Sequence, residues 1–153
     1  MEWKCTASPC PGGGGKATAP TSPTGRPVLP ARLDYTIYIP HDPRGVGICR
    51  RTLRDILTSH HLPTLVEPAE LLASELLGNA IRHTEGPAAL KLRQSGSTLR
   101  LGAWDTDPTP PSTKPQDDES GRGLRLVDAY ADDWGWFRVN GTAGKYVWCD
   151  LGS

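Results

Sequence analysis

The chain has 153 residues, of which 37% are hydrophobic and 22% are charged, and its 17 Lys and Arg balance its 17 Asp and Glu. This length suits one folded domain with a substantial core, plus a tail. Zero net charge gives no basic field that would attract nucleic acid or an anionic membrane surface, so we expect neither as a direct partner. The sequence contains no run of about 18 apolar residues, which is the length that a membrane span needs. The N-terminus also lacks the apolar stretch of a signal peptide, so we expect a cytoplasmic protein.

Residues 1–30 are predicted to be a disordered tail, with the folded domain at 31–153. The tail holds six prolines and five glycines and almost no apolar pattern. Such a segment cannot bury enough surface to offset the entropy of ordering it. Its GGGGK run at 12–16 resembles a phosphate-binding loop only superficially, because Ala17 stands where that loop requires Ser or Thr.

A strand and two helices are expected next. Residues 32–40 alternate apolar and polar side chains, which is typical of a strand. Asp42 is predicted to be the N-cap of a helix that starts at Pro43 and ends near His61. A second helix is expected over 67–83, because apolar residues recur there at helical spacing and Gly86-Pro87 follows.

The second half of the chain is predicted to be mostly strands. A hairpin is expected from 88–94 and 97–105. A long polar loop, 106–120, then leads to a short helix over 121–131. A last hairpin is expected from 133–141 and 144–151. The order of elements predicts an α+β fold: a two-layer α/β sandwich whose mixed, mostly antiparallel sheet carries about three helices on one face.

The cysteines, tryptophans and paired histidines of the folded part have structural roles that their local sequence predicts. Cys49 and Cys149 fall in apolar patterns, so they are predicted to be small core residues rather than metal ligands or disulfide partners. One of the two tryptophans in WGW (134–136) is expected to be core. His60 and His61 end the first helix and are expected to complement its dipole; a metal site is the alternative.

The second predicted helix carries a polar stripe that includes Glu75 and Asn79. At 100° per residue, apolar side chains fill about half of its circumference, and these two residues lie on the other half. They nevertheless lie beside leucines, which a fully solvated face rarely has. The stripe therefore indicates a partly closed cleft, and the alternative is an ordinary helix surface.

Two further motifs could form the other walls of such a cleft. Asp105 ends an alternating strand, where a carboxylate could accept a hydrogen bond from an exocyclic amine; the alternative is a turn-forming aspartate. In the GRGL stretch at 121–124, the glycines let the backbone approach a bulky anion, and the helix that follows offers free N–H groups. The alternative there is a flexible helix entry.

With these motifs in this order, the chain resembles the ATP-binding domain of the GHKL (Bergerat-fold) superfamily, which includes histidine kinases, gyrase-type ATPases, Hsp90 chaperones and anti-sigma-factor kinases. ELLGNAIRH (75–83) resembles the N-box of this superfamily. AWDTDPTPP (103–111) resembles its adenine-binding box, and ESGRGLRLV (119–127) resembles its second glycine box. The closing DWGWFRVNGTAGKYVWCDL (133–151) is similar to the last hairpin of the small anti-sigma-type members. The resemblance covers about residues 33–151.

The resemblance implies ATP and Mg²⁺ as cofactors and a role for each matching residue. Asn79 would coordinate Mg²⁺, and Glu75 would be the general base. Asp105 would accept a hydrogen bond from the adenine amine. The glycine box would border the phosphates through Gly121, Arg122, Gly123 and Leu124. His83 would orient the site, and the loop 106–120 would be its lid.

Two positions depart from the family pattern. Asp107 stands where the adenine box usually has a glycine. Tyr146 stands where small anti-sigma-type members often have a threonine in the last strand. If that side chain helps to hold adenine, Tyr146 is expected to reorganise the pocket or to weaken binding.

The resemblance predicts a regulator of the anti-sigma-factor kinase type, which phosphorylates Ser or Thr of a small antagonist protein. Its protein partner would be a sigma factor or that antagonist, and a homodimer is also compatible with the sequence. Two alternatives remain at this point. One is a nucleotide-binding module that acts through protein contacts without phosphotransfer, and the other is a domain that has lost nucleotide binding.

Overall fold

The computed structural model describes residues 33–111 and 122–152, and the predicted tail 1–30 lies outside them. Every element predicted in the described ranges is present, with bounds that differ by a few residues. In chain order the elements are β1 (Asp34–Ile39), α1 (Arg44–Ser59), the short 3₁₀ helix η1 (Pro63–Leu65), α2 (Val66–Arg82), β2 (Ala88–Ser95), β3 (Thr98–Asp105), α3 (Arg122–Tyr130), β4 (Asp133–Arg138) and β5 (Lys145–Gly152).

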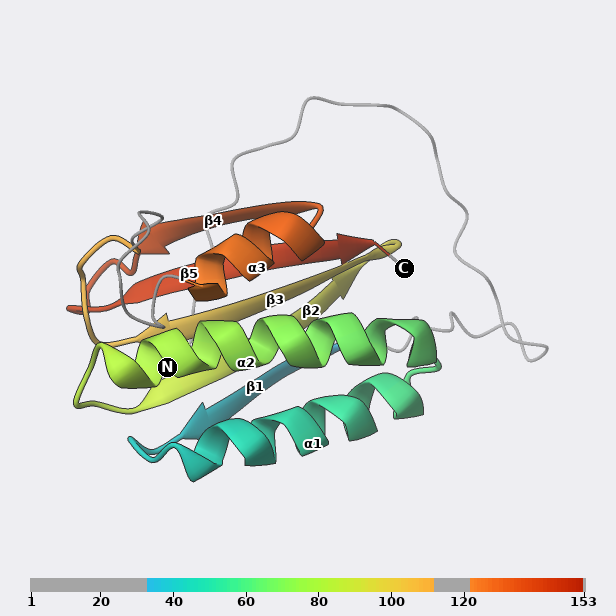
Figure 1. Ribbon diagram of the computed structural model, residues 1–153, viewed down its shortest axis with the longest axis horizontal. Coiled ribbons are helices and arrows are strands. Elements are labelled where there is room, and N and C mark those ends of the chain that lie inside the picture. The colour runs from blue at the N-terminus through green and yellow to red at the C-terminus, as the bar shows by residue number, and fades with distance from the viewer. Residues whose placement is uncertain (1–32, 112–121, 153) are drawn as a thin grey trace, which may run out of the picture. The chain divides into compact units, whose positions relative to one another are not determined.

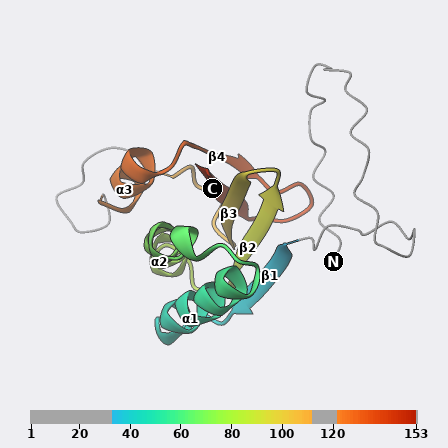
Figure 2. The same ribbon diagram turned by 90° about the vertical axis from the view of Figure 1, so that its right-hand side faces the viewer.

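The strands form one 5-stranded sheet in the order β1-β2-β3-β5-β4. The three α-helices cover one face of it, with α2 between α1 and α3 (Figures 1 and 2), so the predicted two-layer sandwich is confirmed. The sheet is not mixed, because each neighbouring pair of described strands is antiparallel. Strands β3 and β4 run parallel, but they do not pair because β5 lies between them. No helix in the described ranges combines the length and apolar character that a membrane crossing needs.

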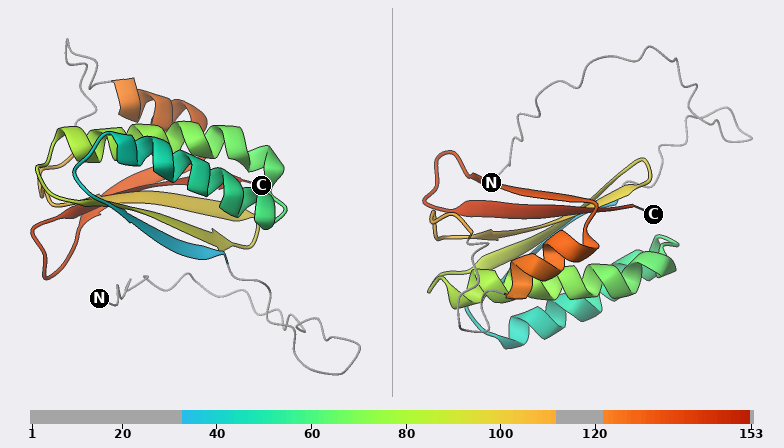
Figure 3. Two further views of the ribbon diagram at one scale, coloured as in Figure 1. Left: turned by 90° about the horizontal axis from the view of Figure 1, so that it is seen from below. Right: turned by 45° about the horizontal axis from the view of Figure 1, so that its top comes forward.

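The core lies between the helices and the covered face of the sheet (Figure 3). Helix α2 supplies most of its helical side, through Ala69, Leu72, Ala73, Leu76, Leu77, Ala80 and Ile81. Cys49 and Cys149 are both fully buried in this core, as predicted. Burial raises the pKa of the Cys49 thiol to about 11 and that of Cys149 to about 12. The thiols therefore stay protonated near neutral pH and act as small apolar side chains.

Side chains make hydrogen bonds near both ends of α1. The helix begins at Arg44, and the Asp42 carboxylate accepts a hydrogen bond from the Arg44 N–H at 2.9 Å. The N-cap is Pro43, one residue later than predicted, and Asp42 makes its hydrogen bond from the residue before the cap. At the other end, His60 Nε2 lies 2.9 Å from the hydroxyl of Tyr35 on β1. In the described part of the chain no group of three or more His, Cys, Asp or Glu could hold a metal ion, so the metal alternative for these histidines has no support.

The other face of the sheet carries no helix, and aromatic side chains line it. Strand register places one residue of each strand in a single row across this face: Tyr38, Ala89, Trp104, Tyr146 and Phe137. The rings of Phe137 and Tyr146 are 5.2 Å apart. Trp134 points to the opposite face and packs against the core, whereas Trp136 is 37% exposed. The prediction that one tryptophan of WGW is core is confirmed.

The aromatic row requires glycine at position 102. A Cβ built at Gly102 would overlap the ring of Tyr146, whereas a Cβ at Gly47 in α1 would meet nothing within 4 Å. We expect Gly102→Ala to lower the free energy of unfolding by about 1–3 kcal/mol, because the ring must move from its packed position. Gly47→Ala, the matched control, should raise it by about 0.5–1 kcal/mol through helix propensity. Urea denaturation measures both, and an unchanged stability for Gly102→Ala would contradict the packing.

Candidate nucleotide-binding site

Three predicted motifs lie at one end of the sandwich. Strand β2 starts shortly after α2 ends, and Ala89 pairs with Trp104, so the end of β3 comes beside the end of α2. The first turn of α3 lies at this same end (Figures 1 and 3). A Cβ at Gly86 would lie 2.7 Å from Thr106 Oγ1, which shows how closely the turn after α2 packs against the residue after β3.

Glu75 and Asn79 lie on the side of α2 that faces away from α1. Glu70 marks the α1 side, because its carboxylate accepts two hydrogen bonds from Arg54, at 2.9 and 2.7 Å. At 100° per residue, Glu75 and Asn79 are turned from Glu70 by about 140° and 180°. Both are half-buried, and α2 contacts α3. The predicted polar stripe therefore borders the α3 side of α2 and is not a fully solvated surface.

The side-chain oxygen of Asn79 has a partner in this structure. Arg82 Nη2 donates to Asn79 Oδ1 at 3.1 Å, and Arg82 Nε donates to the carbonyl of Gly78 at 3.2 Å. Arg82 is exposed, so its side chain can leave Oδ1 without unpacking the core. A neutral amide oxygen suits Mg²⁺, which needs only one or two protein ligands when phosphate oxygens and waters complete its shell. The donor set at this end therefore fits a metal brought in with a triphosphate.

Asp105 is a buried carboxylate at the end of β3, with 3% of its surface exposed. Its Oδ1 accepts hydrogen bonds from the Asp107 N–H at 2.9 Å and from Lys145 Nζ at 3.1 Å. Burial raises the pKa of the Asp105 carboxyl, while the Asp107 N–H and the Lys145 charge act in the opposite direction. The bond from the Asp107 N–H, two residues further on, is the one expected of a turn-forming aspartate, and Lys145 in β5 supplies the second partner of this carboxylate.

Lys145 is a residue of this site that the motif analysis missed. It pairs with Asp105 in the β3–β5 register and is itself 6% exposed. The alternation of side chains along β5 could have revealed its burial, because Val147 and Cys149 point to the core and Lys145 lies on the same side of the strand. A lysine on a buried face needs a carboxylate partner.

Asp107, which replaces the glycine of the family pattern, fits its position without strain. Its carbonyl accepts a hydrogen bond from Lys145 Nζ at 3.0 Å, and its carboxylate lies 3.8 Å from the same nitrogen. Hydrogen bonds with Thr109 hold the pKa of the Asp107 carboxyl below its usual range. Among the non-glycine residues that the structure describes, His61 alone has a positive φ. The backbone at position 107 therefore adopts a conformation that does not require glycine.

The glycine box is described in part. Gly121 lies outside the described residues, as does most of the predicted lid, and α3 begins at Arg122. The side chain of Leu124 is buried in the core, so its backbone is the part that a ligand could contact. The first turn of α3 offers N–H groups that have no partner within a helix, and these groups and the helix dipole favour an anion.

Tyr146 lies in the last strand, as predicted, but on the face away from Asp105. In the β3–β5 register it is opposite Trp104, on the helix-free face, where its ring packs over Gly102. Asp105 and Lys145 lie on the covered face. The condition on which Tyr146 was expected to reorganise the pocket or to weaken binding is therefore not met at Asp105, because neighbouring residues of a strand point to opposite faces.

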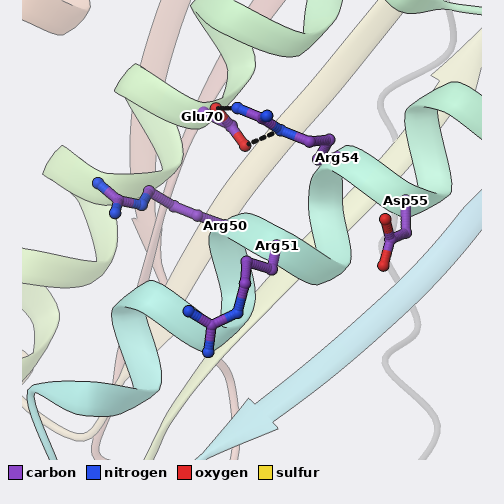
Figure 4. Close-up of a pocket in the computed structure, with 5 residues that line it drawn as sticks. All are labelled: Arg50, Arg51, Arg54, Asp55 and Glu70. Atoms are coloured by element: carbon purple, nitrogen blue, oxygen red, sulfur yellow. Dashed lines mark hydrogen bonds and ion pairs between the residues drawn. The ribbon is translucent and has the colours of Figure 1, made fainter.

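A hollow on the outer side of α1 and α2 lies apart from this end of the sandwich. It is lined by Arg50, Arg51, Arg54, Asp55 and Glu70 (Figure 4). Glu70 precedes Asn79 by nine residues, which is about 13 Å along a helix, and it lies on the opposite side of α2. The Arg54–Glu70 ion pair explains the arrangement of two of these side chains.

Comparison with known families identifies the fold. Residues 39–149 match the family described as the histidine kinase-like ATPase domain. The chain belongs to this family. It is therefore a GHKL-type ATPase domain, and its membership implies ATP binding. No curated protein matches the sequence. The family match spans α2, β3 and α3, the elements that bring Asn79, Asp105 and the glycine box to one end of this ATPase domain.

The buried pair of Asp105 and Lys145 should be important for stability in the absence of any ligand. Asp105→Ala leaves the Lys145 charge buried without its carboxylate, so we expect a loss of about 3 kcal/mol in the free energy of unfolding. The control is Asp150→Ala, which breaks the ion pair with Arg100, a side chain that is 47% exposed. That change should cost about 1 kcal/mol or less. Urea denaturation at neutral pH compares the two, and equal losses would contradict the difference in burial.

Proposed function

We propose that this ATPase domain binds Mg·ATP at the shared end of α2, β3 and α3, and that it is a regulatory protein kinase of the anti-sigma-factor type. The observation that carries the proposal is the convergence of a half-buried amide, a buried carboxylate and a helix N-terminus at one end of the sandwich. These three groups differ in chemistry, and each matches a different part of a metal-bound adenine nucleotide.

Each residue has a role that follows from its chemistry. Asn79 Oδ1 would hold Mg²⁺, which would neutralise the charge of the phosphates. The backbone of Gly121, Arg122, Gly123 and Leu124 would border the phosphates at the start of α3. Asp105 would accept a hydrogen bond from the exocyclic amine of adenine, with Oδ2 as the accepting atom because Oδ1 holds Lys145 and Asp107.

Phosphotransfer would use Glu75, which lies one helical turn before Asn79 on α2. A Ser or Thr hydroxyl of the antagonist would attack the γ-phosphorus, and the bond from that phosphorus to the β,γ-bridging oxygen would break. Glu75 would take the hydroxyl proton, and ADP would leave. The charge added to the antagonist would change its affinity for this domain, and the domain would then exchange that antagonist for a sigma factor.

Nucleotide binding is tested by calorimetry with Mg·ATP. We expect wild type to bind, and Asn79→Ala to weaken binding by roughly tenfold or more, because a metal ligand is lost. Without Mg²⁺ the two proteins should differ much less. Asn140→Ala changes an exposed asparagine between β4 and β5 and should bind like wild type. If wild type does not bind Mg·ATP, the proposed function is contradicted, and a domain that has lost nucleotide binding is favoured.

Phosphotransfer is tested with γ-labelled ATP and candidate antagonist proteins. We expect Glu75→Ala to retain Mg·ATP binding and to lose about 10²–10⁴-fold in label transfer, which is the usual contribution of a general base. Glu67→Ala, an exposed change in the first turn of the same helix, should transfer at the wild-type rate. Transfer that survives in Glu75→Ala would exclude Glu75 as the base. Binding of Mg·ATP to wild type without transfer to any antagonist would favour a module that acts through protein contacts.

A further inference from the structure

Lys145 is a lysine buried beside a buried carboxylate, which is an unusual position for a charged side chain. Only 7% of the Lys145 side chain is exposed, and Nζ has three acceptors nearby: Asp105 Oδ1 at 3.1 Å, the Asp107 carbonyl at 3.0 Å and Asp107 Oδ2 at 3.8 Å. Burying an ammonium group is costly unless it is paired and hydrogen-bonded. Here one ammonium joins the end of β3 to the turn that follows it.

The position of Lys145 is fixed by the backbone on both sides. Lys145 is the first residue of β5 and pairs with Asp105 in the strand register. The preceding residue, Gly144, packs so closely against the carbonyl of Asp105 that a Cβ there would overlap it. The ammonium group therefore has little freedom to leave Asp105, in contrast to the exposed Arg82 beside Asn79.

We propose that Lys145 is a positioning residue that makes the nucleotide site selective for 6-amino over 6-oxo purines. It would do so by holding Asp105 Oδ1 and the Asp107 turn, so that Oδ2 of an ionised carboxylate faces the base. This inference rests on the proposed function, because it assumes that Asp105 receives the base. Lys145 itself would not touch the nucleotide.

The selectivity follows from the hydrogen-bonding character of the two groups. A carboxylate accepts hydrogen bonds only, so it pairs with an exocyclic amine and repels a carbonyl oxygen. A site built to pair with an N–H group rejects an analogue that lacks it, because buried polar groups are then left unpaired. Without the lysine, burial raises the pKa of the Asp105 carboxyl further. A protonated carboxyl can donate to a 6-oxo group, and the penalty for that base shrinks.

The experiment compares ATP with inosine triphosphate, which carries a 6-oxo group, on the full chain by calorimetry with Mg²⁺. Wild type should prefer ATP by at least about tenfold. Lys145→Met keeps the apolar stem and removes the charge, and it should reduce that preference by roughly tenfold while ATP binding weakens. Lys91→Met is the matched control, because Lys91 is half-buried on the helix-free face of β2. Its preference should equal that of wild type.

The outcomes separate this inference from the proposed function. If wild type and Lys145→Met both bind ATP with the same preference over inosine triphosphate, Lys145 has no role in selectivity and the proposed function stands. If wild type binds neither nucleotide, both proposals fail. If Lys145→Met does not fold, Lys145→Gln retains a hydrogen-bond donor without the charge. That variant should also lose most of the preference, and an unchanged preference in it would overturn the inference.

Discussion

The pairing of β5 with β3 is the constraint on which the candidate site depends. This ladder runs from Thr98 opposite Gly152 to Asp105 opposite Lys145, so backbone hydrogen bonds fix which side chains meet at its end. They bring together a carboxylate and an ammonium group that are 40 residues apart in the chain. Because the pair is buried, each charge is stable there only with the other, and the register cannot slip without separating them.

The two faces of the sheet have different roles, and the site is at the edge of the covered one. Between the helices and the sheet, the side chains are almost entirely apolar, and Asp105 and Lys145 are exceptions at one end. In such surroundings an unpaired polar group is costly, so a hydrogen bond to Asp105 is worth more than one to an exposed carboxylate. The helix-free face, with its row of aromatic side chains, contributes to the packing of the sheet and not to this site.

Much of the fold could be predicted because short-range periodicity survives in the structure. Alternation located the strands, helical spacing located α1 and α2, and the apolar contexts of Cys49 and Cys149 correctly predicted their burial. The same alternation determines the face of Tyr146. Val147 and Cys149 lie on the core side, so Tyr146 beside Val147 must face the other way, and its position in a family motif does not carry this information.

The roles of the candidate residues were less accessible from the sequence. Spacing within α2 predicted that Glu75 and Asn79 share a stripe, because helical geometry is local. It could not predict that Arg82 donates a hydrogen bond to the amide oxygen of Asn79, since that contact depends on the conformation of a long exposed side chain. Likewise, the motif containing Asp105 predicted an acceptor for a base but not the lysine that holds its other oxygen.

The sequence alone determined the element types, the residues that form the core and the family, because these depend on periodicity and on motifs that are contiguous in the chain. The order of strands was decided only by the tertiary structure. The last hairpin could have placed either β4 or β5 beside β3, and both arrangements keep the same local pattern. With β5 in the centre, Val147, Cys149 and Leu151 are buried against the helices, and Lys145 reaches Asp105. Long-range burial and charge pairing, which no local pattern records, therefore decided which lysine completes the site.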